Sequence, residues 1–277
     1  MPHIPFRKMH GLGNDFVVLD RRRDTVAIDA ATARALADRR TGIGCDQLIL
    51  IEPAQDPAAQ IFMRILNADG SEAEACGNGT RCIARLVADE TGEKRIRIET
   101  AAGLLDAELT PDGNVAVDMG PARTAWHEIP LAREMDTARV ALSLGPLIEP
   151  VCTNIGNPHA TFFVPDAEAI DLAALGPRLE HDKLFPERAN IGVGNVLDTG
   201  RIRLRVWERG AGITRACGTG ASATAVAAIL TKRVQSPVKV TMRGGSLTIS
   251  WEPGQPIRMR GGATYVFKGE IDLEALA

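Results

Sequence analysis

The chain has 277 residues, of which 45% are hydrophobic and 24% are charged, enough to bury the core of one large domain or two medium ones. The formal net charge of -3, with no basic run longer than Arg21 to Arg23, argues against nucleic acid or an anionic membrane as the main partner. The first eight residues contain no apolar signal segment, and no run of about 18 apolar residues follows, so we expect a cytoplasmic protein that acts on a small molecule.

In chain order, short β-branched and apolar runs alternate with a smaller number of helical stretches, a pattern typical of a mixed α/β fold. Asp29 is a candidate N-cap for the first helix, and Gly42 and Gly92 follow the ends of the first and second helices. The expected order is strand 16–19, helix 29–39, strands 48–51 and 61–66, helix 80–90, strands 95–98 and 115–119, helix 168–175, strand 202–207, helix 221–230, and strands 238–242 and 247–251.

An internal repeat is the most informative feature of the sequence. Residues 64–79 align with residues 205–220 at a constant offset of 141, and each copy ends in Ala-Cys-Gly-x-Gly. A second match, at an offset of 143, pairs Asn14 with Asn157. Two matches in the same order predict a duplicated domain, with a first half at 1–120 and a second half at 121–263, and a proline-containing junction over 121–150.

The repeat predicts that Cys76 and Cys217 are equivalent and face a ligand cleft between the halves. Each cysteine precedes the first turn of a predicted helix, where backbone N–H groups and the helix dipole favour an anion. We therefore expect the pKa of both thiols to be lowered from about 8.5 toward neutrality. One thiolate and one thiol suffice to invert an α-carbon, taking a proton from one face and returning one to the other. No lysine motif for pyridoxal phosphate is present, so no cofactor is expected.

The two helices that follow these cysteines differ in charge. Residues 221–230 carry no charged side chain, which predicts a helix enclosed by protein. The helix after Cys76 carries Arg81 and Arg85, which predicts a face that is wetter or paired with acids.

Other interpretations of the cysteines are less favourable. Cys45, Cys82 and Cys152 have no counterpart in the repeat and are expected to be buried core residues. The spacing of Cys76 and Cys82 does not fit a zinc site, and a redox dithiol would favour Cys-x-x-Cys, so no metal is expected. A non-catalytic binding protein of the same fold remains an alternative, although binding alone would not need paired thiols.

Seven motifs, in order along the chain, resemble the diaminopimelate epimerase family. They are residues 10–16 (His-Gly-Leu-Gly-Asn-Asp-Phe), 42–47 (Gly-Ile-Gly-Cys-Asp-Gln), 67–70 (Asn-Ala-Asp-Gly), 76–81 (Cys-Gly-Asn-Gly-Thr-Arg), 156–159 (Gly-Asn-Pro-His), 208–210 (Glu-Arg-Gly) and 216–220 (Ala-Cys-Gly-Thr-Gly). The resemblance implies two pseudo-symmetric α/β domains, each a mixed sheet or barrel wrapped around a central helix. It also implies that a strand in 264–277 returns to the first domain.

By this resemblance, Cys76 and Cys217 are the base and acid that interconvert LL- and meso-diaminopimelate for lysine and peptidoglycan precursor synthesis, and His159 and Glu208 tune their ionisation. In the repeat, Glu208 aligns with Asn67 and His159 with Phe16, so the halves differ chemically, as a substrate with unlike ends requires. The implied substrate contacts are Asn14, Gln47, Asn67, Gly77, Asn78, Asn157, Asn190, Glu208, Arg209, Gly218 and Thr219.

The resemblance leaves the substrate and the assembly partly open. Proline racemases also have paired cysteines, but they show a Cys-Gly-His turn where this chain has Asn78, so a proline or hydroxyproline racemase or epimerase is the alternative. Family members commonly form homodimers, and Tyr265 and Phe267 are candidates for an interface near the C-terminus.

Overall fold

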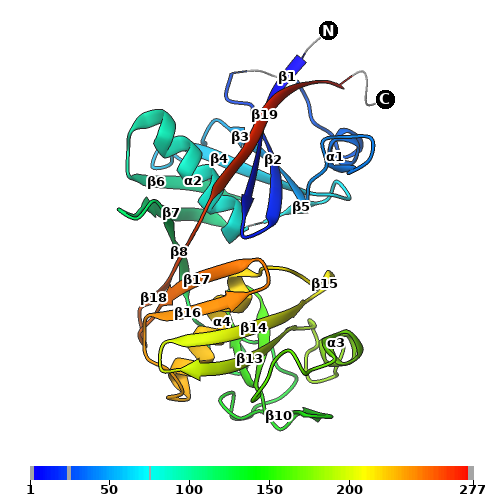
Figure 1. The fold of residues 1–277 in the computed structure, drawn as a ribbon, viewed down its shortest axis with the longest axis vertical. Coiled ribbons are helices and arrows are strands. Elements are labelled where there is room, and N and C mark those ends of the chain that lie inside the picture. The colour runs from blue at the N-terminus through cyan, green and yellow to red at the C-terminus, as the bar shows by residue number, and fades with distance from the viewer. Residues whose placement is uncertain (1–2, 24–25, 75, 274–277) are drawn as a thin grey trace. The chain divides into compact units, whose positions relative to one another are not determined.

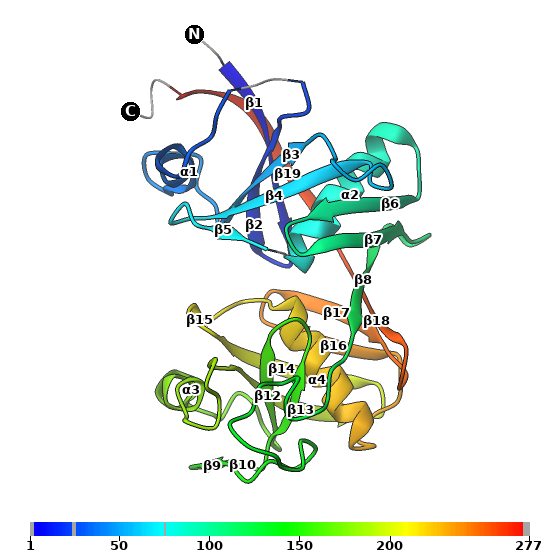
Figure 2. The same cartoon turned by 180° about the vertical axis from the view of Figure 1, so that it is seen from behind.

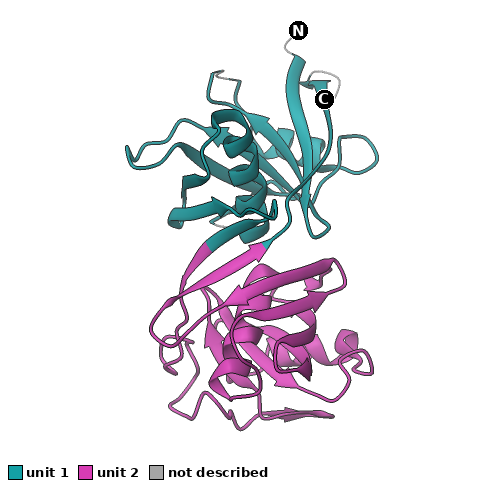
Figure 3. Cartoon of the chain, turned by 60° about the vertical axis from the view of Figure 1, so that its left-hand side comes forward, with its two compact units in different colours: residues 1–117, 261–277 teal, residues 118–260 magenta. Residues whose placement is uncertain are grey.

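A computed structural model describes residues 3–23, 26–74 and 76–273 of the chain. The chain divides into two compact units, residues 1–117 with 261–277 and residues 118–260 (Figure 3). It passes from the first unit to the second within strand β8, Val115–Pro121, and returns within β18, Pro256–Gly261. The second unit is therefore an insertion in the first.

Unit 1 is a mixed sheet with two helices (Figure 1). Strands β1 and β2 are antiparallel, β2 is parallel to β3, β4 is antiparallel to β3 and β5 and parallel to β6, and β7 is antiparallel to β6 and β8. The last strand, β19, pairs antiparallel with β1. The elements are β1 His3–Gly11, β2 Asn14–Asp20, α1 Ala30–Ala37, β3 Gln47–Glu52, β4 Ile61–Asn67, β5 Glu72–Ala73, α2 Gly77–Thr91, β6 Arg95–Thr100, β7 Gly103–Leu109 and β19 Thr264–Asp272.

Unit 2 repeats this order of pairings. Strands β11 and β12 are antiparallel, β12 is parallel to β13, β14 is antiparallel to β13 and β15 and parallel to β16, and β17 is antiparallel to β16 and β18. The elements are β9 Ser143–Leu144, β10 Leu147–Ile148, β11 Val151–Asn154, β12 Pro158–Phe163, α3 Leu172–Glu180, β13 Asn190–Asp198, β14 Arg201–Glu208, β15 Gly212–Ile213, α4 Gly218–Leu230, β16 Val238–Met242 and β17 Gly245–Ser250.

The strand register confirms the predicted repeat. In unit 1, Phe16 lies opposite Gln47, and in unit 2 His159 lies opposite Asn190. Both members of the second pair stand 143 residues after those of the first. Leu66 pairs with Glu72 just as Trp207 pairs with Ile213, at the other offset of 141. The two offsets differ because the segment from Gln47 to Leu66 is two residues longer than the equivalent segment from Asn190 to Trp207.

Each unit encloses one helix against its sheet. Helix α4 contacts β11 to β14, β16 and β17, and its residues from Gly220 to Ala228 are buried. Figures 1 and 2 show α4 from opposite sides, with strands of its own unit in front of it in both views. This burial explains why the helix carries no charge and confirms the predicted enclosure as far as Ala228, whereas Leu230 at its end is exposed. Helix α2 packs on β1, β6 and β7. The observed architecture confirms the predicted fold class.

Three helix predictions need correction. The fourth helix begins at Gly218, three residues before the predicted start, because Cys217 caps it. The third helix spans Leu172–Glu180, not 168–175, because the Asp171 side chain accepts the Ala174 N–H and makes the N-cap. The Glu168 carboxylate is engaged instead by Arg203. The second helix begins at Gly77, three residues before the predicted start, since Cys76 itself caps it. Among the described helices, none combines the length and apolar character needed to cross a bilayer.

Gly42, just after α1, is expected to tolerate no side chain. A Cβ atom there would lie 2.1 Å from the Ala35 carbonyl oxygen and 2.8 Å from that of Leu36. We expect Gly42→Ala to lower the free energy of unfolding in urea by about 3 kcal/mol. Gly92→Ala is the matched control, since Gly92 has φ 77 with no described heavy atom within 4 Å of the added Cβ, and it should cost about 1 kcal/mol. An equal loss of unfolding free energy in the two variants would contradict the steric role of Gly42.

Candidate functional site

Cys76 and Cys217 occupy the same local structure in the two units. Both have extended backbone, with φ −147 and ψ 105 at Cys76 and φ −133 and ψ 114 at Cys217, and both are the N-cap of the helix that follows. The Cys76 sulfur accepts the N–H of Gly79 at 3.5 Å, and the Cys217 sulfur accepts the N–H of Gly220 at 3.3 Å. Each sulfur is therefore held at the positive end of a helix dipole.

Glycine is required where the capped N–H comes from. A Cβ on Gly220 would lie 3.1 Å from the Cys217 sulfur and 3.1 Å from Val206 Cγ2, and a Cβ on Gly79 would lie 2.9 Å from Ile49 Cδ1. All three contacts are tighter than side chains normally allow. The second glycine of each Cys-Gly-x-Gly motif thus lets the helix approach the sheet, and Gly220 also leaves room for the Cys217 sulfur.

In unit 1, the predicted polar residues form hydrogen bonds with one another. The Asn78 amide donates to Asn14 Oδ1 at 3.1 Å, and the Cys76 thiol lies 3.8 Å from the same oxygen. Gln47 donates to Asn67 Oδ1 at 2.9 Å, at the ends of the paired strands β3 and β4. The structure thus places the side chains predicted for this half in two hydrogen-bonded pairs, one of which contacts the cysteine.

In unit 2, a second polar group forms where β12 and β13 begin. His159 Nε2 lies 2.8 Å from Asn157 Oδ1. Asn190 donates to the Pro158 carbonyl at 2.9 Å and accepts the backbone N–H of Arg209 at 2.9 Å. With both ends of its amide occupied, Asn190 fixes the backbone that carries Arg209.

Cys217 lies against Glu208. The Glu208 carboxylate is near enough to the Cys217 thiol for each group to shift the pKa of the other, and it accepts from the Thr214 hydroxyl. Thr219 Oγ1 lies 3.5 Å from the Cys217 sulfur. In the repeat, Glu208 stands where unit 1 has Asn67, which bonds to Gln47 and Ser71. Cys217 therefore faces a carboxylate, whereas Cys76 faces the amide of Asn14.

The expected lowering of the thiol pKa is wrong for Cys217. Burial raises the pKa of this thiol well above its usual value, and the negative charge of Glu208 raises it further. Hydrogen bonds from Thr219 and the Gly220 N–H oppose the rise but do not outweigh it. The helix dipole alone therefore does not decide the ionisation of a thiol this deeply buried. Glu208 also has a raised pKa, again chiefly because of burial.

His159 is held neutral in this environment. It is 1% exposed, and burial lowers its pKa to about 3, with a smaller contribution from the positive charge of Arg209. A neutral imidazole can accept a proton or share one by hydrogen bonding, but it contributes no fixed charge.

The remaining cysteines are buried in the cores, as predicted. Burial raises the pKa of Cys45 to about 11 and that of Cys82 to about 12, and it also raises the pKa of Cys152. A thiol with so high a pKa is a poor acid or base near neutral pH. Burial and a raised pKa do not by themselves set these three apart, because Cys217 shares both; the helix-capping pair differs in that each sulfur accepts a helix N–H.

Three contacts were not predicted from the sequence. Arg81 is fully buried, against the expectation of a wet or acid-paired face, and donates to Asn78 Oδ1 at 2.8 Å and to the Gly77 carbonyl at 3.3 Å. Arg85 does pair with an acid, Asp89. Asp46 accepts from Asn14 at 3.0 Å, and Thr214 supports Glu208. Asp46 lies within the motif at 42–47, which was the available signal, but no sequence pattern distinguishes Thr214.

Comparison with known proteins gives one consistent family. The diaminopimelate epimerase family model matches residues 6–125 and 151–266. The diaminopimelate epimerase of Rhodospirillum centenum is 57% identical over 266 residues, covering 96% of this chain and 91% of the relative. That of Rhizorhabdus wittichii is 56% identical over 273 residues, covering 98% and 97%.

Solved structures of lower identity share the fold. A PhzF-family phenazine biosynthesis protein from Bacillus anthracis has a TM-score of 0.69 at 16% identity, covering 98% of this chain and 99% of that one. A probable proline racemase from Agrobacterium radiobacter has a TM-score of 0.70 at 18% identity, covering 98% and 93%.

The proximity of Glu208 predicts how the ionisation of the Cys217 thiol responds to a mutation. Replacing Glu208 by Gln removes a negative charge beside the thiol, so the pKa of Cys217 should fall and its thiolate should form at lower pH. The test is the pH dependence of iodoacetamide alkylation, mapped to the peptide containing Cys217 by mass spectrometry. Glu168→Gln, in the same unit but paired with Arg203, should leave the profile unchanged. An unchanged or raised midpoint in Glu208→Gln would refute the role of its charge.

Proposed function

The chain belongs to the diaminopimelate epimerase family, and on this basis we propose that it interconverts LL- and meso-diaminopimelate without a cofactor. This isomerase activity serves lysine and peptidoglycan precursor synthesis. The observation that carries the proposal is the pair of cysteines that cap equivalent helices in a duplicated fold.

Cys76 and Cys217 are the proposed base and acid. Inversion requires that a thiolate take the α-proton from one face of the substrate, leaving the electron pair on carbon, and that the other thiol donate a proton to the opposite face. The charge moves from the first sulfur to the second during each turnover. The reverse reaction uses the same residues in exchanged roles.

The carbanion is stabilised by the helix N-termini in this proposal. The first N–H of α2 to reach a backbone carbonyl is that of Thr80, which bonds to Cys76 O at 2.8 Å, and in α4 it is that of Ala221, which bonds to Cys217 O at 3.0 Å. The N–H groups of the preceding helix residues are those that a helix leaves for an anion. Gly77, Asn78, Gly218 and Thr219 would hold the reacting carboxylate through these groups, where the positive ends of the dipoles favour developing negative charge.

The distal amino acid end is assigned to the polar side chains of both units. Arg209 supplies a cation for the distal carboxylate and Glu208 an acceptor for the distal ammonium. Asn190 contributes by fixing the Arg209 backbone. The remaining proposed contacts are Asn14, Gln47, Asn67 and Asn157. A site that hydrogen-bonds one stereocentre in this way rejects analogues that leave its groups unpaired.

Glu208 and His159 are the proposed modulators of thiol ionisation. Support is strongest for Glu208, whose charge raises the pKa of Cys217 and so favours the protonated thiol there. His159 is neutral and hydrogen-bonded to Asn157, so it would act through a hydrogen bond. We also assign the enzyme to the cytoplasm, where glutathione and thioredoxin keep thiols in the reduced form that acid–base catalysis requires.

A homodimer is part of the proposal. Strand β19 exposes Tyr265, Val266 and Phe267 by 42%, 53% and 51%, three large apolar side chains in succession. Such a row on the strand that closes a sheet favours contact with a second copy of the chain.

Two alternatives have less support. A proline or hydroxyproline substrate rests on solved structures that share only the fold, whereas the close relatives in sequence are diaminopimelate epimerases. A binding protein without activity would not need two equivalent, helix-capping thiols.

The first test is hydrogen exchange during turnover. Reduced protein incubated with LL-diaminopimelate in D2O should yield meso product carrying deuterium at one α-carbon, observed by mass spectrometry and NMR. Cys76→Ala and Cys217→Ala should each lower the rate by about 10²- to 10⁴-fold, the usual contribution of a general acid or base. Cys45→Ala and Cys152→Ala, one in each unit, should retain activity.

The controls separate the mechanism from the substrate. Deuterium incorporation into proline but not into diaminopimelate would support the two-thiol mechanism and reject diaminopimelate as the substrate. Exchange with neither, in folded protein, would favour a binding protein. Full activity in either helix-cap variant would reject the mechanism.

The dimer is tested on β19. Phe267→Asp should convert the protein from twice 29.6 kDa to a monomer of that mass in sedimentation analysis, because a charge placed in an apolar interface remains unpaired. Ile148→Asp, at a similarly exposed apolar residue of β10, should remain dimeric. A wild-type monomer, or equal behaviour of the two variants, would reject this surface.

A further inference from the structure

The Cys76 thiol shares its acceptor with a chain of hydrogen bonds that runs through unit 1. Asn14 Oδ1 lies 3.8 Å from the sulfur and accepts from the Asn78 amide at 3.1 Å. Asn78 Oδ1 accepts from Arg81 at 2.8 Å, and the Asn14 amide nitrogen donates to Asp46 at 3.0 Å. The chain therefore joins a buried guanidinium at one end to a carboxylate at the other.

The two charged ends determine the orientation of both amides. A guanidinium can only donate, so Asn78 must turn its oxygen toward Arg81 and its nitrogen toward Asn14. A carboxylate can only accept, so Asn14 must turn its nitrogen toward Asp46. Both requirements leave the Asn14 oxygen on the side of Cys76. The sulfur thus faces an acceptor, which a thiol can satisfy and a thiolate cannot.

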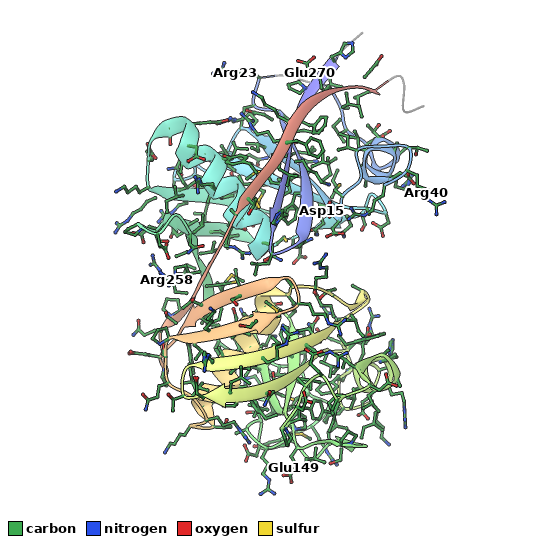
Figure 4. The ribbon with its side chains drawn as sticks, viewed as in Figure 1. Asp15, Arg23, Arg40, Glu149, Arg258 and Glu270 are labelled. Atoms are coloured by element: carbon green, nitrogen blue, oxygen red, sulfur yellow. The ribbon has the colours of Figure 1, made fainter. Side chains whose placement is uncertain are left out.

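Asp46 is itself held in place. Arg39 donates to Asp46 at 2.7 Å and to Asp15 at 2.7 Å, and Lys8 pairs with Asp15 at 2.5 Å. The Asp15 side chain, labelled in Figure 4, is 17% exposed, while that of Asp46 is 45% exposed. The Asp15 N–H also donates to Asp46, at 3.1 Å. One ion pair and one backbone bond therefore anchor the Asp46 carboxylate that holds Asn14, and Asp15 in turn pairs with Arg39.

Unit 2 has no copy of this arrangement among the described residues. Asn157, the counterpart of Asn14, bonds to His159, and Ser222 stands at the position of Arg81. Cys217 faces Glu208 instead. The difference shows that the series of hydrogen bonds around Cys76 does not follow from the repeated fold alone.

We propose that Asp46 is a positioning residue for Cys76: by clamping the Asn14 amide, it presents a carbonyl oxygen to the sulfur and holds Cys76 as a thiol in the free enzyme. Asn14 is also a proposed substrate contact, so substrate that engages this amide releases the sulfur to ionise. Cys76 then becomes reactive when substrate is bound, and less so when the site is empty.

Other charged groups near Cys76 do not give the same directional control. Arg81 and Cys82, both on α2, interact with it electrostatically, and β1, on which α2 packs, carries Lys8 and His10. Arg39 bonds to Asp15 and to Asp46, and Asp46 connects them to Cys76 through Asn14. Of these groups, Asp46 is the one that bonds to the amide facing the sulfur.

The test compares two substitutions of Asp46 in the full-length protein without substrate. Asp46→Ala removes the acceptor that anchors the Asn14 nitrogen, so the Asn14 side chain can swing away from the sulfur while its oxygen still accepts from Asn78. The thiol then loses the acceptor that favours its protonated form, and alkylation of Cys76 by iodoacetamide near pH 7.5 should be about tenfold faster. Asp46→Asn keeps an acceptor oxygen but no charge, and its rate should stay close to that of wild type. Both side chains of the Arg39–Asp46 pair are substantially exposed, so the variants should fold.

The pattern of rates decides between positioning and charge. Equal acceleration in Asp46→Ala and Asp46→Asn would show a through-space effect of the charge and overturn the proposal, as would no acceleration in Asp46→Ala. Alkylation of Cys217 in the same samples should not change. Asp38→Ala is the matched control, since Asp38 caps N–H groups of the same loop at Arg40 and Thr41.

The proposal rests on Cys76 as an acid–base residue, but its test does not require turnover. Loss of epimerase activity with the alkylation pattern intact would therefore count against the proposed function alone. If the enzyme is active, the acidic limb of the pH profile of kcat/KM should move to lower pH in Asp46→Ala but not in Asp46→Asn.

Discussion

The hydrogen bond from a backbone N–H to a cysteine sulfur at the start of a helix is the interaction on which the rest of the site depends. The bond joins Gly79 to Cys76 and Gly220 to Cys217. It determines where the helix begins and where the sulfur points. It also explains why the third residue after each cysteine is a glycine. The same turn leaves the preceding N–H groups for a carboxylate. One local motif thus provides both an acid–base group and the means to stabilise the charge that it creates.

The two copies of this motif are alike in backbone and unlike in surroundings. Cys76 faces the neutral Asn14 carbonyl, which is held by charged residues at a distance, whereas Cys217 faces the Glu208 carboxylate directly. A strictly symmetric pair of thiols would compete equally for one proton. Different acceptors hold both sulfurs as thiols in the free enzyme but by different means, so substrate that engages Asn14 can release Cys76 alone as the base.

The sequence predicted what depends on local pattern or on the repeat. The helix at 29–39 and the equivalence of His159 with Phe16 followed from capping residues and from two offsets, and the structure confirms both. Strand β13 was missed because Gly192 and Gly194 interrupt its apolar pattern; these glycines let Thr224 of α4 approach the sheet. The raised pKa of Cys217 and the burial of Arg81 depend on contacts between distant segments, which periodicity does not report. For this reason the two cysteines could be identified from the sequence, but the direction of the pKa shift of Cys217 could not.

The insertion of unit 2 within unit 1 has a consequence for synthesis of the chain. During translation, β1 leaves the ribosome near the beginning, but its antiparallel partner β19 is made only after all of unit 2. Unit 2 is contiguous in sequence, so it can fold completely before β19 is made and pairs with the open edge of β1. The first unit to begin is thus the last to finish, and a nascent chain passes through a stage in which the lysine- and arginine-bearing strand β1 is an open edge. Charges on that strand protect it from pairing with other nascent chains before β19 arrives.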